Sequence, residues 1–333
     1  YAGGNKLSKN PLLRKMINIV FIAYEFPPLR FGGVFRSLGF VKYLPDYGIN
    51  PIVITLSQES YSNLYPEVPI DHQFEKEVLD KSNIAEAVSS YGKLEERSKW
   101  KDFLEIYFSI HGSEAKYWRV DFEQKLADTI SNFSPKAIYI TVPPFSNIKL
   151  ALKGSKRYSI PLIIDFRDAW SQWRTVPFGS RLHYWMTLYF ERVYLNRATA
   201  VITTSEQTLS DFLRLYPRIN GSKFHYIPNG YDGELKTWTP LVPSKSIFSI
   251  GYVGSFYYAP EARDQMLTPW WKKTGHRMLQ YVPQKQDWLY RSPFFFFKTL
   301  AYLKKEYPFF AKRIKVQFVG RIYPWLREMI EEF

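Results

Sequence analysis

The chain alternates short apolar runs, rich in isoleucine and valine, with segments that have the periodicity of helices. Runs of strand length occur at 17–24, 52–55, 137–141, 162–166, 200–204, 224–227, 247–253 and 316–319. Helical spacing occurs at 34–44, 122–133, 147–158, 182–197, 206–216 and 296–306. Parallel strands need crossover connections, which are right-handed and cover both faces of the sheet with helices. The sequence therefore predicts an α/β fold with a doubly wound parallel sheet.

The domain organisation follows from length and from one turn-rich stretch. A chain of 333 residues corresponds to two domains of about 150 residues each. Glycines and prolines cluster at 229–246, which makes this stretch the best linker candidate. It separates an N-terminal Rossmann-like domain, 16–228, from a C-terminal one, 247–333. The second is too short for a complete doubly wound domain, so we expect a C-terminally truncated chain. Residues 57–118 are interpreted as irregular, with one helix near 100–110.

The composition is basic and aromatic. Lysine and arginine number 45 against 31 acidic residues, which gives a formal charge of +14. Such a field attracts nucleic acid, anionic lipid or phosphorylated small molecules, and charge alone does not distinguish them. Residues 251–333 carry 14 basic residues, 7 acidic residues and 21 aromatic residues. That combination suits peripheral contact with an anionic membrane, although core packing is the favoured explanation, above all for residues 294–297.

Several classes of site are excluded or disfavoured. Without cysteine, the chain has no disulfide, no cysteine nucleophile and no thiolate metal ligand. The histidines lack metal-ligand spacing and no Asp-x-Asp motif occurs, so we expect no metal. A P-loop and a Gly-x-Ser-x-Gly elbow are also missing, which disfavours NTPases and hydrolases.

Unusual residues follow the predicted strands at the end where open parallel sheets bind ligands. Gly32 and Gly33 stand between the first strand and its helix, where a ligand can approach the backbone and the helix N–H groups. Arg36 adds a cation in the first turn that suits phosphate or carboxylate. An ordinary tight turn is the alternative explanation of the glycines.

The segment after the strand at 162–166 carries an unusual density of charge. Asp165, Arg167 and Asp168 lie within four positions, which favours a site facing a cleft. An internal ion pair between aspartate and arginine is the alternative. Ser205 marks a helix start that can also bind a polar ligand, and Asn229 lies in the turn after the last strand of this domain.

The second domain opens with a similar turn. Gly254 and Ser255 follow its first strand, and Arg263, Lys272 and Lys273 come shortly after. The two domains therefore each offer a strand-end face suited to anionic groups. A cleft between such domains fits a nucleoside diphosphate compound.

Five pieces of the sequence, considered as an ordered set, resemble the family 4 glycosyltransferases. They are AYEFPPLRFGGVFR, LIIDFRDAW, ATAVITTSEQTL, KFHYIPNGYD and IGYVGSF, all within residues 17–256. The family has the two-Rossmann GT-B architecture, and the pattern is most similar to bacterial enzymes that build surface polysaccharides. The resemblance implies retaining transfer of a sugar, of hexosyltransferase type, from a nucleotide-sugar donor to a glycan or lipid-linked acceptor. It implies no cofactor and no metal, and a cytoplasmic protein associated with the inner face of the cell membrane.

The resemblance also implies roles for residues of the N-terminal domain. Asp168, together with Arg167, would contact the reacting sugar or acceptor, and these two are the predicted catalytic residues. Gly32 and Gly33 would shape the floor beneath the donor phosphates. The predicted binding residues of this domain are completed by Arg36, Asp165, Ser205 and Asn229.

In the C-terminal domain, Gly254 and Ser255 match the glycine turn beside the donor pyrophosphate. The family usually places an arginine and a lysine soon after this turn. In this sequence the candidates for those two cations are Arg263 and the pair Lys272 and Lys273. The paired glutamates that contact the donor should lie beyond residue 333. A chain that ends there is expected to show little or no transfer.

Two alternatives remain open from the sequence. One is a non-catalytic module that binds nucleic acid or anionic lipid through basic and aromatic residues. It leaves the glycine turns and charged strand ends without a role, so nucleic acid is not the expected partner. The other is a nucleotide-sugar epimerase of the same architecture.

Overall fold

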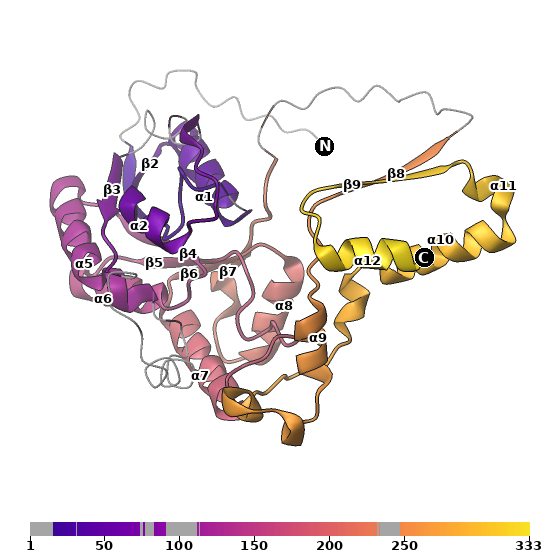
Figure 1. Ribbon diagram of the computed structural model, residues 1–333. Helices are drawn as coiled ribbons and strands as arrows, with labels where there is room; N and C mark the ends of the chain where they lie inside the picture. The colour runs from indigo at the N-terminus through magenta and orange to yellow at the C-terminus, as the bar shows by residue number, and fades with distance from the viewer. Residues whose placement is uncertain are drawn as a thin grey trace. The chain divides into compact units, whose positions relative to one another are not determined.

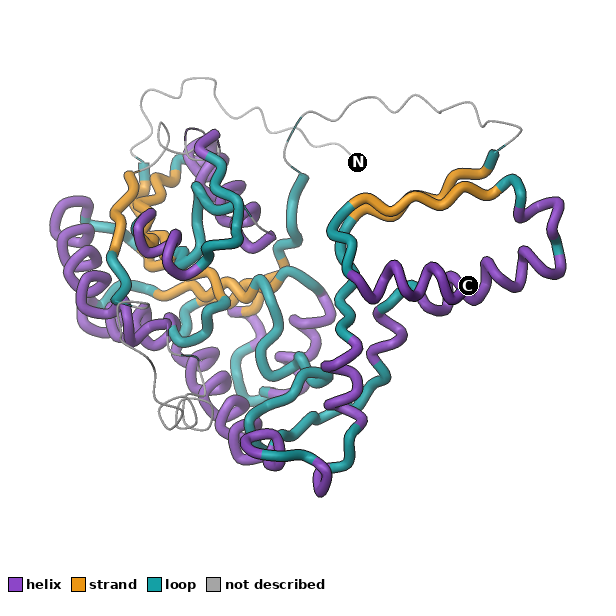
Figure 2. The backbone as a smooth tube through the Cα atoms, in the orientation of Figure 1, coloured by secondary structure: helices purple, strands orange, loops and turns teal. Residues whose placement is uncertain are grey.

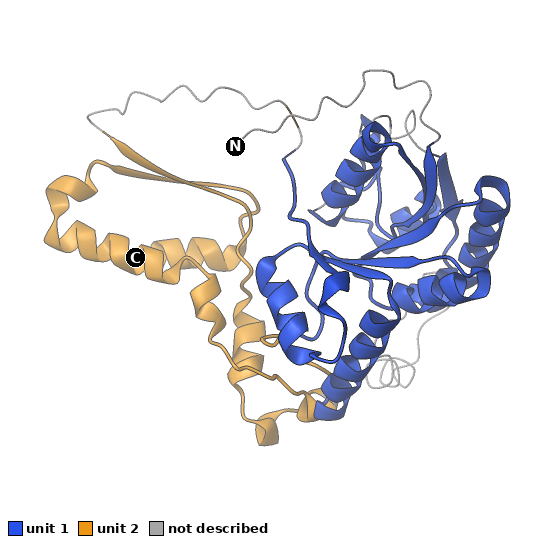
Figure 3. Cartoon of the chain, turned by 180° about the vertical axis from the view of Figure 1, so that it is seen from behind, with its two compact units in different colours: residues 1–173, 180–232 blue, residues 174–179, 233–333 orange. Residues whose placement is uncertain are grey.

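The computed structural model describes residues 16–30, 32–73, 76, 83–90, 112, 114–231, 233 and 247–333. The chain forms two compact units (Figure 3). Unit 1 comprises residues 1–173 and 180–232, and unit 2 comprises residues 174–179 and 233–333. Most of the predicted linker and the helix expected near 100–110 lie outside the described residues.

Unit 1 is built on a seven-stranded sheet in the order β3-β2-β1-β4-β5-β6-β7 (Figure 1). Each neighbouring pair in this order is parallel. The strands are β1 (Ile17–Ile22), β2 (Ile49–Leu56), β3 (Asn83–Ala87), β4 (Ala137–Val142), β5 (Leu162–Phe166), β6 (Ala200–Thr203) and β7 (Phe224–Tyr226). The predicted α/β fold with a parallel sheet is confirmed.

The strand order changes direction beside β1. The chain runs from β1 outward through β2 to β3, and returns to place β4 on the other side of β1. In open parallel sheets, ligands bind outside the carboxyl ends of the strands at such a switch point. The segments that follow β1 and β4 therefore frame the edge where a ligand is expected.

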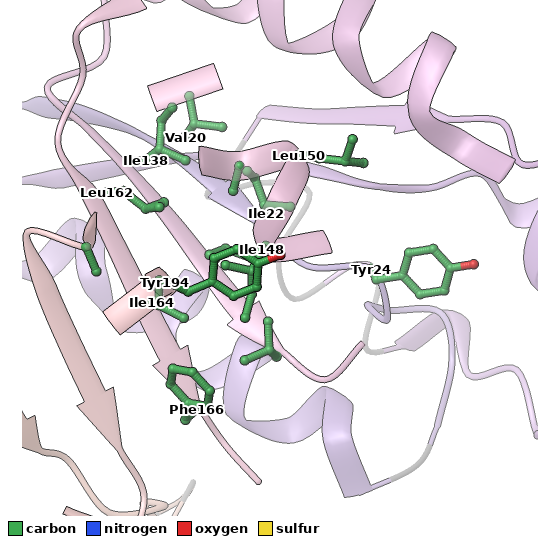
Figure 4. Close-up of a cluster of buried hydrophobic side chains, with 14 of the residues drawn as sticks. Val20, Ile22, Tyr24, Ile138, Ile148, Leu150, Leu162, Ile164, Phe166 and Tyr194 are labelled. Carbon is green, nitrogen blue, oxygen red and sulfur yellow. The ribbon is translucent and has the colours of Figure 1, made fainter. Parts of the chain in front are cut away.

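Helices cover both faces of this sheet. They are α1 (Gly32–Tyr43), α2 (Gln58–Leu64), α5 (Glu114–Phe133), α6 (Asn147–Tyr158), α7 (Arg181–Arg197) and α8 (Glu206–Leu215), with short 3₁₀ turns at η2 (Leu44–Tyr47) and η3 (Gly221–Lys223). Successive strand residues point to opposite faces. On β1, Val20 and Ile22 enter a large core with α5, α6, α7 and α8, whereas Phe21 enters a smaller core with α1. Figure 4 shows part of the large core.

The region predicted to be irregular contains regular elements. Both α2 and β3 lie within it, and α5 begins at Glu114 rather than at 122. β3 lies at the edge of the sheet, so its sequence NIAEA has no need of the apolar run that marks a central strand. The first turns of α5 bury Trp118, whose Nε1 donates to Asn147 Oδ1 at 2.9 Å. Tertiary contacts thus specify these elements.

Unit 2 contains a parallel pair of strands, β8 (Phe248–Val253) and β9 (Ile314–Val319), drawn in orange at the right of Figure 2. Its helices are α9 (Pro260–Leu267), α10 (Phe294–Glu306), α11 (Pro308–Ala311) and α12 (Pro324–Glu332), with 3₁₀ turns at η4 (Trp270–Lys272), η5 (Gly275–Leu279) and η6 (Trp288–Arg291). A small core forms around Phe297, Leu326 and Met329. The segment 174–179 joins this unit through paired backbone hydrogen bonds between Phe178 and Tyr281.

None of the described helices is both long enough and apolar enough to cross a bilayer.

The face of α5 that is buried can be tested by truncation. Phe122 is fully buried, so Phe122→Ala should lower the free energy of unfolding by about 3–5 kcal/mol through lost burial and a residual cavity. Val120, on the same helix, is 79% exposed, and Val120→Ala should cost less than about 0.5 kcal/mol. Urea denaturation followed by circular dichroism measures both. Equal effects would contradict this orientation of α5.

Candidate functional site

The charged residues of unit 1 gather where its strands end. We use the term strand-end site for the side chains and backbone groups at or just after the carboxyl ends of β1, β5, β6 and β7, together with the start of α1. Its members are Glu25, Gly32, Gly33, Arg36, Asp165, Arg167, Asp168, Thr204, Ser205 and Asn229.

Arg36 and Asp165 form a bidentate ion pair at the centre of this edge. Arg36 Nε donates to Asp165 Oδ2 and Nη2 donates to Oδ1, both at 2.8 Å. The two side chains are 5% and 0% exposed. Tyr139 Oη donates to the same Asp165 Oδ2 at 2.7 Å. Burial and the neighbouring carboxylate raise the pKa of Tyr139 well above its usual value, so the phenol keeps the proton that it donates.

Arg36 also holds the segment after β7. Its Nη1 donates to the Pro228 carbonyl and to Asn229 Oδ1, both at 3.2 Å. The charge and most donors of Arg36 are therefore used inside the protein, and Asp165 is out of reach of a ligand. The geometry favours the internal ion pair over donor binding for both residues, and the partner of Asp165 is Arg36 rather than the neighbouring Arg167.

A second ion pair lies beside the first helix. Arg167 Nη2 bonds to the Glu25 carboxylate, and Nη1 donates to the Gly33 carbonyl at 2.9 Å. Their side chains are 7% and 11% exposed. Tyr65 Oη donates to the other Glu25 oxygen at 3.1 Å. Burial raises the pKa of Glu25, and the Arg167 guanidinium opposes that rise.

Sequence reasoning missed Glu25 and Tyr65 as members of the site. A single glutamate after a strand carries no signal by itself. The available signal was indirect: an arginine at the end of a buried strand needs a carboxylate partner, and Glu25 lies three residues after β1 of the same sheet.

The two glycines at the start of α1 differ in their surroundings. A Cβ on Gly33 would lie 2.8 Å from Arg167 Cζ, whereas a Cβ on Gly32 would meet nothing within 4 Å. Glycine is therefore needed at position 33 because the Arg167 side chain lies against the backbone there. Gly32 is exposed, and the first N–H groups of α1 have no partner within the helix, so this end can accept an anion.

Asp168 is the accessible charge of the site. Its side chain is 59% exposed, and its Oδ2 lies 3.9 Å from the buried Arg167 Nε. That Nε has no hydrogen-bond partner among the described residues. The segment that carries Arg167 and Asp168 is held by the residue that follows β6, because Thr204 Oγ1 donates to the Arg167 carbonyl at 2.9 Å. Ser205 caps α8, since its Oγ accepts from Thr208 N at 3.1 Å.

A buried carboxylate supports the end of the same segment. Glu191, on α7, is fully buried and accepts hydrogen bonds from Ser171 N at 3.2 Å and from Gln172 Nε2 at 3.0 Å. Ser171 Oγ and Tyr216 Oη also donate to it, both at 2.5 Å. These contacts attach the loop that carries Arg167 and Asp168 to α7 and to the end of α8.

The site residues predicted in the C-terminal domain lie in unit 2, and one of them already has a protein partner. Arg263 donates to both carboxylate oxygens of Asp287, at 2.6 and 2.9 Å, so it is engaged in an ion pair. The hydrogen bonds from Arg263 lower the pKa of Asp287 to about 2. Burial, with Lys285 and Arg277 nearby, lowers the pKa of Lys273.

Gly254 and Ser255 follow β8 as predicted, and Gly254 has a φ of 141°, which favours glycine. Lys272 is exposed at the end of η4. The structure thus brings Gly33, Arg36, Asp165, Arg167, Asp168 and Asn229 to one edge of unit 1. Gly254, Ser255, Arg263, Lys272 and Lys273 belong to unit 2.

Part of the strand-end site lies within a segment that matches a family model. Residues 89–235 match Glycosyltransferase Family 4. This match covers under half of the chain and includes Asp165, Arg167, Asp168 and Asn229. It confirms the resemblance drawn from the sequence pieces. No curated protein matches the chain.

Several solved structures are similar to the chain at low sequence identity. Anabaena Alr3699/HepE in complex with UDP-glucose matches 92% of this chain and 70% of its own, with 14% identity and a TM-score of 0.42. Sucrose-phosphate synthase from Thermosynechococcus elongatus covers 92% and 71%, with 17% identity and a TM-score of 0.41. Acinetobacter baumannii MurG covers 93% and 68%, with 10% identity and a TM-score of 0.38.

The neighbouring glycines provide a matched test of the Arg167 position. In Gly33→Ala the new methyl group displaces the guanidinium, which weakens the buried pair with Glu25. We expect the free energy of unfolding to fall by about 1–3 kcal/mol. In Gly32→Ala, which has open space, it should stay constant or rise by up to about 1 kcal/mol. Thermal unfolding of both variants measures this. The same sign in both would contradict the assigned contact.

Glu191 makes the free energy of unfolding depend on pH. Burial raises its pKa above the usual 4.5, although hydrogen bonds from Ser171 and Tyr216 oppose this. The folded state therefore keeps this proton to higher pH than the unfolded chain, and its ionisation lowers stability as pH rises from about 4.5 through the raised pKa. The Glu191→Gln variant lacks that loss. Its free energy of unfolding, relative to the wild type, should increase in denaturant titrations as the pH rises above about 4.5. A constant difference would contradict this account.

Proposed function

We propose that the protein is a retaining glycosyltransferase of hexosyl type, which uses a nucleotide-sugar donor and a glycan or lipid-linked acceptor in surface polysaccharide synthesis. The observation that carries the proposal is the exposed Asp168 carboxylate beside the buried Arg167, at the carboxyl edge of the sheet and within the family 4 segment. This edge is where open parallel sheets bind ligands.

Asp168 is the residue best placed to contact a sugar. Its carboxylate is accessible, and carboxylates accept hydrogen bonds from sugar or acceptor hydroxyl groups. Arg167 is held by Glu25 and by the Gly33 carbonyl, so its position does not depend on the ligand. A charge held in place before the reaction stabilises a transition state without a reorganisation cost. In this role Asp168 is catalytic and Arg167 positions it.

The start of α1 suits the phosphate groups. Loss of the nucleoside diphosphate places negative charge on phosphate oxygens, and helix N–H groups stabilise such charge. Gly32 leaves the backbone open at this point. We infer that the donor phosphates approach α1 at Gly32, while Gly33 serves the Arg167 contact.

The proposal includes no cofactor and no metal ion, so transfer should continue in the presence of EDTA. It places the protein in the cytoplasm, at the inner face of the membrane when the acceptor is lipid-linked. The residues of unit 2 that follow β8 remain candidates for the donor pyrophosphate, with Lys272 as an exposed cation.

Asp168→Asn is the test of this proposal. Transfer to an acceptor from UDP- and GDP-sugars should fall about 100-fold, because the carboxylate that contacts the reacting groups loses its charge. The melting temperature should stay unchanged, because the side chain is 59% exposed. The control is Asp46→Asn. Asp46 is exposed and precedes β2, so it lies at the amino ends of the strands rather than at their carboxyl ends.

Donor binding is measured separately as thermal stabilisation of the wild type by UDP, GDP and their sugars. Stabilisation by oligonucleotides alone would favour the binding module over the transferase. Conversion of a nucleotide-sugar without an added acceptor would favour the epimerase. Full transfer by Asp168→Asn would overturn the role of this carboxylate.

A further inference from the structure

The outward face of α7 is apolar. Leu182, Trp185, Met186 and Tyr189 are 65%, 56%, 37% and 59% exposed. Their spacing places them on one side of the helix, and we call them the α7 stripe. A helix at the surface of a globular domain normally directs such a stripe toward the core. Here the stripe faces away from it.

The opposite side of α7 is the buried one. It presents Thr187, Glu191, Tyr194 and Leu195 to the core, about half a turn away from the stripe. Glu191 fixes this orientation through its hydrogen bonds to Ser171, Gln172 and Tyr216. The exposure of the stripe is therefore a property of how α7 is anchored within unit 1.

A basic cavity lies at the carboxyl end of the same helix. Its volume is about 510 Å³, and Arg192 and Arg197 of α7 line it together with Arg218 from the segment after α8. Val193 and Tyr216 add apolar and aromatic walls. No carboxylate in the described part of the chain forms an ion pair with any of these three arginines.

The stripe and the cavity are continuous along α7. Arg192 is exposed and follows Tyr189 by three positions, so it continues the same side of the helix, whereas Val193 next to it is partly buried against the large core. Toward the carboxyl end of α7, the outward side of the helix therefore changes from apolar and aromatic side chains to guanidinium groups. Glu191 is the single acidic residue of α7, and it is buried, so this surface presents no acidic side chain of α7.

We propose that the α7 stripe and the arginine cavity dock the protein on a bilayer that contains anionic lipids. Tryptophan and tyrosine prefer the interface between headgroups and acyl chains, where leucine and methionine can bury their apolar surface. The arginines meet lipid phosphates, which match them in charge and in geometry. This inference names a surface for the membrane association included in the proposed function, but it is argued from unit 1 alone, and its test measures lipid binding rather than sugar transfer, so the two can fail separately.

The test is co-sedimentation with vesicles. The wild type should bind vesicles of equal phosphatidylcholine and phosphatidylglycerol at least 10-fold more strongly than phosphatidylcholine alone, and high salt should weaken the binding. The double variant Trp185→Ser, Tyr189→Ser should bind at least 10-fold less. The triple variant Arg192→Gln, Arg197→Gln, Arg218→Gln should lose the preference for phosphatidylglycerol.

The matched control is the double variant Trp270→Ser, Trp271→Ser in unit 2, which removes two tryptophans that are 67% and 65% exposed. It should bind as the wild type does. Circular dichroism and thermal unfolding establish that each variant is folded, and donor stabilisation is measured separately. The proposal is overturned if the wild type ignores phosphatidylglycerol, if both α7 variants bind normally, or if the control alone loses binding.

Discussion

The buried pair of Arg36 and Asp165 is the interaction on which the strand-end site depends. Removing charges from water is costly, and a buried ion pair is tolerated when each hydrogen-bonding atom has a partner. Asp165 has two bonds from Arg36 and one from Tyr139. Arg36 also reaches Pro228 and Asn229. One guanidinium thus connects the first helix, the fifth strand and the segment after the seventh.

The second pair, Arg167 with Glu25, is also buried but lies next to accessible surface, and it leaves Arg167 Nε without a hydrogen-bond partner among the described residues. Its geometry requires a missing Cβ at Gly33, because the guanidinium lies where that atom would be. Asp168 then extends into solvent from a backbone held by Thr204. A buried and paired cation beside an exposed carboxylate is an arrangement that can bind a polar ligand without first reorganising.

Glu191 links this site to the outside of the molecule. Its hydrogen bonds hold the loop after Asp168 and determine which side of α7 faces the core. The apolar residues of α7 are exposed as a consequence. The helical periodicity of 182–197 predicts the helix but does not say which side is buried, because both sides contain apolar residues and the decisive buried group is a carboxylate.

The sequence by itself determined the alternation of strands and helices, the parallel sheet and the edge at which charged residues collect, because these follow from local periodicity. Only the tertiary structure decided the partners. Arg36 meets Asp165 across 129 positions, and Arg167 meets Glu25 across 142. Such pairing depends on strand order and side-chain reach, which no local pattern encodes. The edge strand at Asn83–Ala87 was missed for the same reason, since its neighbour in the sheet specifies it rather than its own polar sequence.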